Sequence, residues 1–470
     1  MVKSRDYQDV YVEERYLDRG AEKPQIKKLT AKNQKTGRES DLAGGLVDFR
    51  YYESILSNFI TARLIVADTG SSVPVDGELK NVLDGLPIRG GENIDLNMLD
   101  PEGNQIKLVG STGGDGLYVN RVKEGLTSED MQKTITVYDL CTKEFFANEQ
   151  TRVPGRYSGK ISESVRKILK DRLKTDKNLD IEETANSYNF IGNDKKPFYT
   201  VSWLMTKCIP ADGAYGKTAG FLFFETKEGF KFKSLETLIG PTQGGGSSNK
   251  KKAKKFHYTG RDVTKRNFKK IINYKINKNI DVQEKLAIGA YNNTSTFFNP
   301  FDFTVKSKDF SMEDDQVGKV KSAGTDIAFV AKEFRMGPTR GMSAVLDMGT
   351  LPIGKDAKEQ VENWNKDKEN LNDKVRERMS QAITRYNQIF SVSVDILIEG
   401  DFSLKAGDTI YCEFPDISAK KEVSKETSGL YLIASLCHKV AGGKASTSLN
   451  LIRDSFGKVS PSSSDDVLLF

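Results

Sequence analysis

The chain has 470 residues, of which 37% are hydrophobic and 29% are charged, and this length predicts several domains that each bury a core of their own. Its 71 basic and 65 acidic residues nearly balance, at a net charge of +6, so a dedicated nucleic-acid-binding function is not implied. No apolar run approaches the roughly 20 residues of a membrane-spanning helix, and we expect no membrane span.

The start of the chain is charged and lacks the apolar segment of a secretory signal, which predicts synthesis in a cytoplasm. Four cysteines lie far apart and never form a CxxC motif. This spacing predicts buried thiols in a reducing compartment rather than disulfides. The four are Cys141, Cys208, Cys412 and Cys437.

Residues 1–40 are polar with few apolar anchors, and we expect an extended N-terminal arm there. Residues 41–150 predict a first antiparallel β-barrel. A short helical turn near Glu53 is followed by short apolar segments bounded by Gly, Asp, Asn or Pro. Its strands are expected at 62–66, 93–98, 105–109, 117–122 and 133–140.

Residues 155–240 predict a small α+β domain. Ser158 is expected to cap a helix whose apolar residues recur every three or four positions up to Leu173. A second helix is expected at 201–207. The segments 221–226 and 230–232, separated by Glu228 and Gly229, are typical of a β-hairpin.

Residues 241–256 combine glycine and serine with a lysine run at 250–255, which predicts a flexible basic linker or loop. A phosphate-cradling loop is the alternative, but no Gly-Lys-Ser/Thr closes the segment. Residues 268–280 alternate apolar and basic side chains, which fits either a strand or a surface segment.

Residues 291–390 form an insertion with a long surface helix over 356–390, packed by one apolar stripe; a partner-binding coiled helix is the alternative. The stripe is Val361, Trp364, Leu371, Val375, Met379, Ala382 and Tyr386. Strands are expected again at 391–398, 409–414, 430–436 and 446–452. Together, 257–290 and 391–457 therefore predict a second β-barrel.

Residues 458–470 are a C-terminal tail rich in serine and aspartate that ends in Val467-Leu468-Leu469-Phe470. This apolar tip either docks into a neighbouring molecule or is an ordinary frayed end.

The two predicted barrels share an order of short segments. Gly91-Glu-Asn-Ile precedes Gly116-Leu-Tyr-Val, as Gly407-Asp-Thr-Ile precedes Gly429-Leu-Tyr-Leu, and residues 134–139 and 448–454 follow at similar spacing. Order and spacing together favour an internal duplication over chance similarity of two β domains. Three chains with two similar barrels each would place six similar lobes around one axis.

Catalytic constellations are not evident, and we assign no catalytic, cofactor-binding or metal-binding residues. His257 and His438 are the two histidines, and neither lies in a context typical of a nucleophilic site. Cys437 precedes His438, but adjacent strand residues point to opposite faces, which disfavours a shared zinc ion. The acidic pairs Glu182-Glu183 and Asp314-Asp315 are the remaining candidates, for a glycosidase-like site.

Several segments resemble the baseplate hub proteins of contractile-tailed bacteriophages, and the base of type VI secretion spike proteins. The resemblance covers most of residues 40–240 and 390–457, but not the stretch from about 290 to 390. The segments that carry it are 196–204, 219–234, 400–401, 404–410, 428–433 and 438–457.

The resemblance implies a β-rich α+β protein with two similar antiparallel barrels, in a non-enzymatic homotrimer of the virion tail. Its implied partners are a hexameric tail tube or tube-initiator protein, a trimeric central spike and neighbouring baseplate wedge proteins. DNA would pass through an axial channel without specific binding, so we expect that channel to avoid a cationic lining. Alternatives are a tail-associated cell-wall hydrolase using acidic residues and a nucleic-acid-binding protein using the lysine run.

Overall fold

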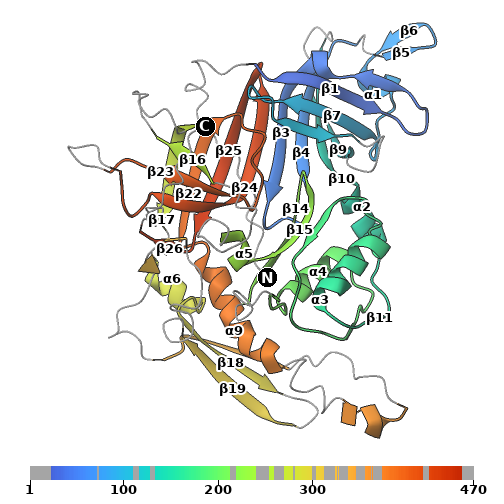
Figure 1. Ribbon diagram of the computed structural model, residues 1–470. Coiled ribbons are helices and arrows are strands. Elements are labelled where there is room, and N and C mark those ends of the chain that lie inside the picture. The colour runs from blue at the N-terminus through green and yellow to red at the C-terminus, as the bar shows by residue number, and fades with distance from the viewer. Residues whose placement is uncertain are drawn as a thin grey trace.

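The computed structural model describes most of the chain between residues 23 and 457. The described residues are 23–70, 73–109, 116–127, 133–211, 219–239, 253–258, 269–278, 281–298, 303–311, 323–324, 326–327, 337–345, 355–360, 362–363, 373–416 and 423–457. The prediction of a β-rich α+β fold is confirmed, because fourteen strands form one large mixed sheet, with helices gathered beside and below it (Figure 1).

The first lobe is an open β-barrel of six main strands in the spatial order β1-β7-β9-β10-β4-β3, whose end strands β1 and β3 do not pair with each other among the described residues. Its strands are β1 (Gln25–Lys32), β3 (Leu46–Ser54), β4 (Thr61–Asp68), β7 (Asn93–Leu99), β9 (Leu117–Thr127) and β10 (Thr134–Thr142). Its smaller elements are β2 (Glu39–Asp41), η2 (Ala43–Gly45), β5 (Val73–Val75), β6 (Glu78–Lys80), α1 (Val82–Gly85) and β8 (Gln105–Leu108).

Two expectations for this lobe are wrong. The described part of the expected N-terminal arm contributes β1 and β2, because Leu29 and Ala31 are fully buried although lysines surround them. Glu53 lies in strand β3 and not in a helical turn. Strand β4 has one buried face, because successive side chains of a strand point to opposite sides of the sheet. Its buried residues Ala62, Leu64 and Val66 alternate with more exposed ones.

The second lobe is a closed six-stranded barrel in the order β16-β23-β24-β25-β22-β17, with β17 pairing back to β16. Its strands are β16 (Lys254–His257), β17 (Lys269–Lys278), β22 (Val392–Glu399), β23 (Thr409–Glu413), β24 (Gly429–Ala441) and β25 (Lys444–Arg453). Residues 254–256 of the expected linker are therefore strand, and Phe256 is fully buried in the barrel.

The α+β part lies between and below the two barrels, around the sheet β12-β15-β14. Its elements are α2 (Lys143–Gln150), β11 (Arg156–Tyr157), α3 (Ile161–Lys167), the π-helical turn η4 (Ile168–Arg172), β12 (Leu179–Ile181), β13 (Phe190–Ile191), α4 (Pro197–Met205), β14 (Phe221–Thr226), β15 (Gly229–Ser234) and α5 (Leu235–Ile239). The predicted hairpin is β14–β15, whereas the residue before α3 is Lys160, not the expected cap Ser158.

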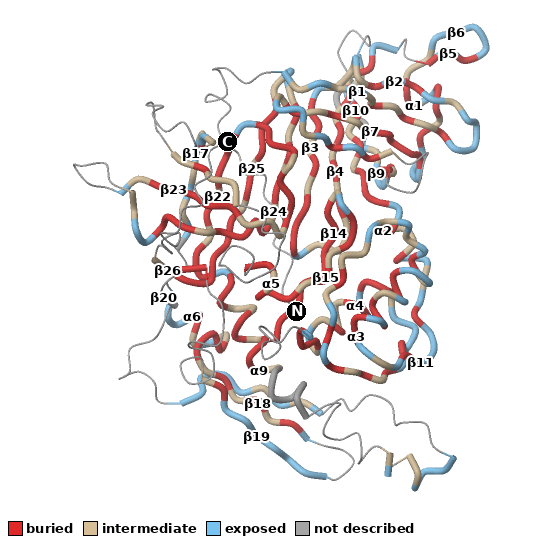
Figure 2. The backbone as a smooth tube through the Cα atoms, viewed as in Figure 1, coloured by how far each residue is buried: buried red, intermediate tan, exposed pale blue. Residues whose placement is uncertain are grey.

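Strand β14 is buried on both faces (Figure 2). Phe221 and Phe223 point into the core of the α+β part, and Leu222 and Phe224 point into a separate core beneath the second barrel. Because both faces are covered by apolar side chains, the sequence Phe-Leu-Phe-Phe lacks the polar alternation of a surface strand.

The insertion between β17 and β22 contains a sheet of three strands in the order β19-β18-β21, packed on helix α9. Its described elements are α6 (Val282–Ala287), β18 (Asn292–Phe298), β19 (Val305–Ser311), β20 (Asp326–Ile327), β21 (Arg340–Val345) and α9 (Asp373–Gln388); β20 pairs with β26 (Ser455–Phe456). Of the helix predicted over 356–390, the structure describes α9 and helical residues at 357–360 and 362–363; Val361, Trp364 and Leu371 of the expected stripe lie outside the described residues. The end of α9 is more deeply buried than expected of a surface helix, because Ser380, Thr384 and Arg385 are buried and hydrogen-bonded.

Candidate assembly site at the junction of the two barrels

Strand β3 of the first barrel pairs with strand β24 of the second. The ladder is antiparallel and runs from Ser435 opposite Ser54 to Ala441 opposite Asp48. The two barrels therefore share one continuous hydrogen-bonded sheet rather than a hinge (Figure 1). A backbone ladder fixes both the spacing and the angle of the two lobes.

The two barrels have the same strand order. Strands β7, β9, β10, β4 and β3 of the first correspond to β23, β24, β25, β22 and β17 of the second, and all four contacts within each set are antiparallel. The sixth position differs in direction, because β1 runs antiparallel to β7 whereas β16 runs parallel to β23.

Two irregularities in the ladders of the first barrel have counterparts in the second, whereas the shifts after Ile26 in β1–β7 and after Thr134 in β9–β10 have none among the described residues. The β3–β4 register shifts at Val47, and the β17–β22 register shifts at Ile272. A second shift occurs at Asn120 between β9 and β10, and at Ala434 between β24 and β25. Because a bulge inserts one extra residue at one particular position, two coincident bulges are strong evidence that the lobes are repeats of one unit.

These bulges fix the alignment of the repeat more closely than the sequence does. The Gly91 amide donates to the carbonyl oxygen of Val119 at 2.7 Å, and the Gly407 amide donates to that of Ile433 at 2.9 Å. Val119 therefore corresponds to Ile433, one residue beyond the match that the Gly-Leu-Tyr segments suggest.

Glu53 holds three parts of the molecule together. Its carboxylate is almost fully buried and accepts hydrogen bonds from the Tyr51 hydroxyl at 2.7 Å, the Lys227 amide at 2.6 Å and the Ala406 amide at 2.9 Å. These groups belong to β3, the β14–β15 turn and the loop before β23. Burial raises the pKa of Glu53 to about 7, against the opposing effect of these hydrogen bonds.

Asp401 forms a second connection between the barrels. Its carboxylate accepts from Lys254 at 2.7 Å and Lys269 at 2.9 Å, and Lys269 also contacts Glu102 of the first barrel at 2.6 Å. Burial alone would raise the pKa of Asp401, but the hydrogen bonds from Lys254, Ser403 and Lys269 lower it well below its usual range. Lys254, which belongs to the lysine run at 250–255, therefore forms an ion pair within the chain.

Arg385 joins the insertion to both neighbouring parts. Its guanidinium donates to Glu236 of α5 and to Asp454 after β25, each at 2.9 Å, and all three side chains are at most 3% exposed. Burial opposes the charge of Arg385, but the two carboxylates outweigh it and raise the pKa.

Lys177 forms a similar buried cluster on the other side of the α+β part. Its ammonium contacts Glu144 of α2 at 2.7 Å and also bonds Glu225 of β14. Glu225 in turn accepts from the Thr142 hydroxyl and the Ile60 amide of the first barrel. The α+β part is thus held to the first barrel by charged groups with satisfied hydrogen bonds.

Both histidines lie in strands of the second barrel. His438 is fully buried, with Nδ1 2.9 Å from the Thr447 hydroxyl and its ring against Tyr51 and Phe402. Burial lowers the pKa of His438 to about 3. His257 lies in β16, 3.4 Å from the Glu413 carboxylate. Of the cysteines, Cys437 is half-buried and the other three are buried, and all four are free thiols.

Of the predicted acidic candidates, the structure describes Glu182 and Glu183. Glu182 accepts hydrogen bonds from the Ser234 amide and hydroxyl, and Glu183 is exposed near Lys160 and Arg166. Asp314 and Asp315 lie outside the described residues, as do residues 250–252 of the lysine run. Among described side chains, no group of three or more His, Cys, Asp or Glu residues is placed to hold a metal ion.

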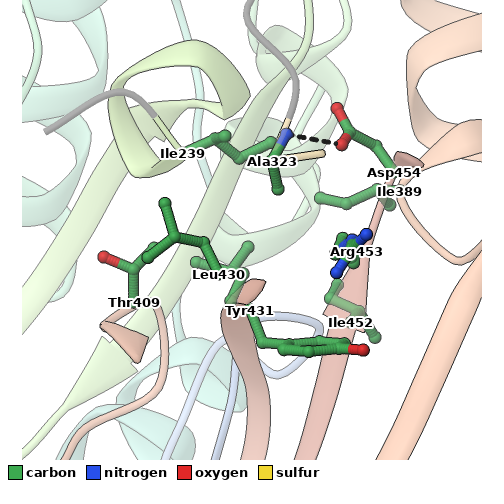
Figure 3. A pocket seen from close by; sticks show the side chains of 10 residues that line it. Ile239, Ala323, Ile389, Thr409, Leu430, Tyr431, Ile452, Arg453 and Asp454 are labelled. Carbon is green, nitrogen blue, oxygen red and sulfur yellow. Dashed lines mark hydrogen bonds between the residues drawn. The ribbon is translucent and has the colours of Figure 1, made fainter. Parts of the chain in front are cut away.

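Figure 3 shows a small cavity between the second barrel, α5 and the insertion, with the Ala323 amide donating to the Asp454 carboxylate at its edge. It has room for about one water molecule, which is too little for a substrate. Its lining is mostly apolar. None of the helices in the described part of the chain is long and apolar enough to cross a membrane.

Comparison with known proteins gives matches of fold and none of sequence. No family model matches the chain, and no curated protein matches it. A prophage MuSo2 43 kDa tail protein from Shewanella oneidensis is similar at a TM-score of 0.49 and 9% identity, over 92% of this chain and 99% of the other. A tail protein from Neisseria meningitidis is similar at 0.48 and 7% identity, over 91% and 96%.

A component of the type VI secretion system from E. coli, described as similar in structure to tail proteins of bacteriophage T4, has a TM-score of 0.40 and 11% identity, over 92% of this chain and 77% of the other. All three TM-scores are below 0.5. In fold, the chain is similar to tail proteins of phages and to spike-related components of type VI secretion systems.

Proposed function

We propose that the chain is a structural hub subunit of a contractile phage tail, located in the virion, with no enzymatic activity. Three copies form a ring of six similar lobes that joins a hexameric tail tube to a trimeric central spike. The observation that carries this proposal is the repeat: two barrels with coincident bulges, held at a fixed angle by the β3–β24 ladder.

Symmetry explains why such a repeat is useful. A trimer of ordinary subunits presents three equivalent surfaces, whereas a hexameric tube requires six. Two repeats per chain supply six similar surfaces from three chains, and the parts that differ supply a threefold surface for the spike. The α+β part and the insertion break the sixfold similarity, since each occurs once in the described part of the chain.

The proposed ring leaves an axial channel for DNA, and wedge proteins of the baseplate would contact its outside. Its interfaces should be of the obligate class, above roughly 2,000 Å². A channel without a cationic lining would let DNA pass, because lysine and arginine would retain phosphates by releasing counterions.

Light scattering coupled to size-exclusion chromatography tests the oligomeric state of the full chain. We expect a molar mass of three subunits, and electron-microscope class averages with six lobes around a threefold axis. A monomer at all accessible concentrations, or a ring of another order, would contradict the proposal. Clearing of peptidoglycan by the isolated chain would instead support a tail-associated hydrolase.

A further inference from the structure

We propose that copies of this chain associate through one particular pair of strand edges: residues 122–127 of β9 in one copy and residues 273–278 of β17 in the next. This inference rests on the proposed ring and names its subunit interface. Because the barrels are repeats of one unit, each strand of the β3–β24 ladder has a counterpart in the other barrel. We expect the two counterparts to pair between copies in the way that β3 and β24 pair within one chain.

The first counterpart is β9, which corresponds to β24. The start of β24 pairs with β23, and from Ser435 onward its free side pairs with β3. In the same way, the start of β9 pairs with β7 at Leu117 and Tyr118. Beyond the bulge at Asn120, the side of β9 that faces away from β10 has no strand partner among the described residues.

The second counterpart is β17, which corresponds to β3. One side of β3 pairs with β4 and the other with β24. Strand β17 pairs with β22 on the equivalent side, but its other side meets β16 at Lys269 and Lys270 alone. From Asn273 to Lys278 this second edge has no strand partner in the described part of the chain.

An unpaired strand edge exposes backbone donors and acceptors that another strand can satisfy. Here the two open edges are the counterparts of two edges that already pair inside the chain. Since each lobe would use its β3-type edge on the β24-type edge of the next lobe, the contact is head-to-tail and closes into a ring when the rotation allows.

The coincident bulges also fix the register. When the two barrels are aligned at these bulges, Asp48 corresponds to Asn273, Tyr52 corresponds to Asn277 and Cys437 corresponds to Lys123. Because Cys437 lies opposite Tyr52 within the chain, Lys123 should lie opposite Asn277 of the next copy. Both of these side chains are exposed in the single chain.

Cysteine pairs test this register. Directly opposed residues of an antiparallel pair have Cβ atoms about 5 Å apart, within reach of a disulfide or a short bis-maleimide. The double variant Lys123→Cys/Asn277→Cys should cross-link into covalent dimers and trimers, with no larger species, because the ring closes at three. Tyr52→Cys is the matched benchmark, since it opposes the native Cys437 and should cross-link within one chain.

Three controls separate the outcomes. Each single variant, Lys123→Cys or Asn277→Cys, reports the background from native cysteines. The pair Lys123→Cys/Asn273→Cys is four residues out of register, about 13 Å along the strand, and should not cross-link. A trimer by mass in which the in-register pair stays unlinked, or the displaced pair links, would overturn this interface while leaving the hub proposal intact. Absence of any oligomer would overturn both.

Discussion

Gly91 and Gly407 occupy equivalent positions in the two barrels, each donating its amide to the equivalent residue of the next strand, Val119 or Ile433. Their backbones are also equivalent, with φ of +86° and +83°. Their surroundings differ. A Cβ on Gly91 would meet no atom within 4 Å, whereas a Cβ on Gly407 would lie 2.7 Å from the ring of Phe224.

This difference predicts unequal costs for the same substitution. Gly91→Ala should lower the free energy of unfolding by about 1 kcal/mol, because alanine is disfavoured at positive φ. Gly407→Ala should cost about 2 to 4 kcal/mol, because the methyl group also displaces Phe224 from the core beneath the barrel. Urea denaturation of the two variants measures the difference, and equal costs would show that Phe224 moves aside freely.

His438 should make stability fall in acid. Its pKa is about 3 in the folded chain and near 6.5 in an unfolded one, so the unfolded chain binds a proton first. The stabilisation is present above pH 6.5 and is lost as the pH falls toward 3, by at most about 5 kcal/mol. The difference in unfolding free energy between the wild type and His438→Gln should therefore shrink over this range. A difference that stays constant from pH 7 to pH 4 would contradict this prediction.

Glu53 should have the opposite pH dependence. Its folded pKa of about 7 exceeds the unfolded value of 4.5, so its contribution is fully present below pH 4.5 and declines as the pH rises through 7. The change should be about 3 kcal/mol. Comparing wild type with Glu53→Gln at pH 4.5 and pH 8 tests this prediction. A difference that grows with pH would show that the hydrogen bonds to the carboxylate outweigh its burial.

Much of the strand pattern could be predicted from the sequence, because apolar alternation with turn residues on either side marks strands such as β4 and β10. Strand β1 was missed because lysines and polar residues surround Leu29 and Ala31. Such a strand becomes evident only when β7 supplies the partner. The bulges at Val47 and Ile272 left no sequence signal, since a bulge is a property of pairing and not of composition.

The charged clusters that connect the lobes could not be predicted from the sequence either. Helix α9 was predicted from apolar residues such as Met379 and Ala382, but Arg385 has a central role in its packing. Its two partners are 149 and 69 residues away along the chain. No local pattern distinguishes such an arginine from the many solvent-exposed ones.

Arg385 provides a test of how the insertion is anchored. Arg385→Met would leave the buried carboxylates of Glu236 and Asp454 without their counterion, and we expect a loss of about 3 to 5 kcal/mol in the free energy of unfolding. The triple variant Arg385→Met/Glu236→Gln/Asp454→Asn should recover part of this loss, because it removes the unpaired charges. Thermal or urea denaturation gives both values.

The matched control is an exposed ion pair of the same molecule. Lys196 contacts Glu149, and both side chains are more than 40% exposed, so Lys196→Met should change stability by at most about 1 kcal/mol. If Arg385→Met costs no more than Lys196→Met, solvent reaches the two carboxylates and the cluster does not fix the insertion. If the triple variant is no more stable than Arg385→Met, the loss comes from the missing hydrogen bonds and packing of the arginine rather than from stranded charge.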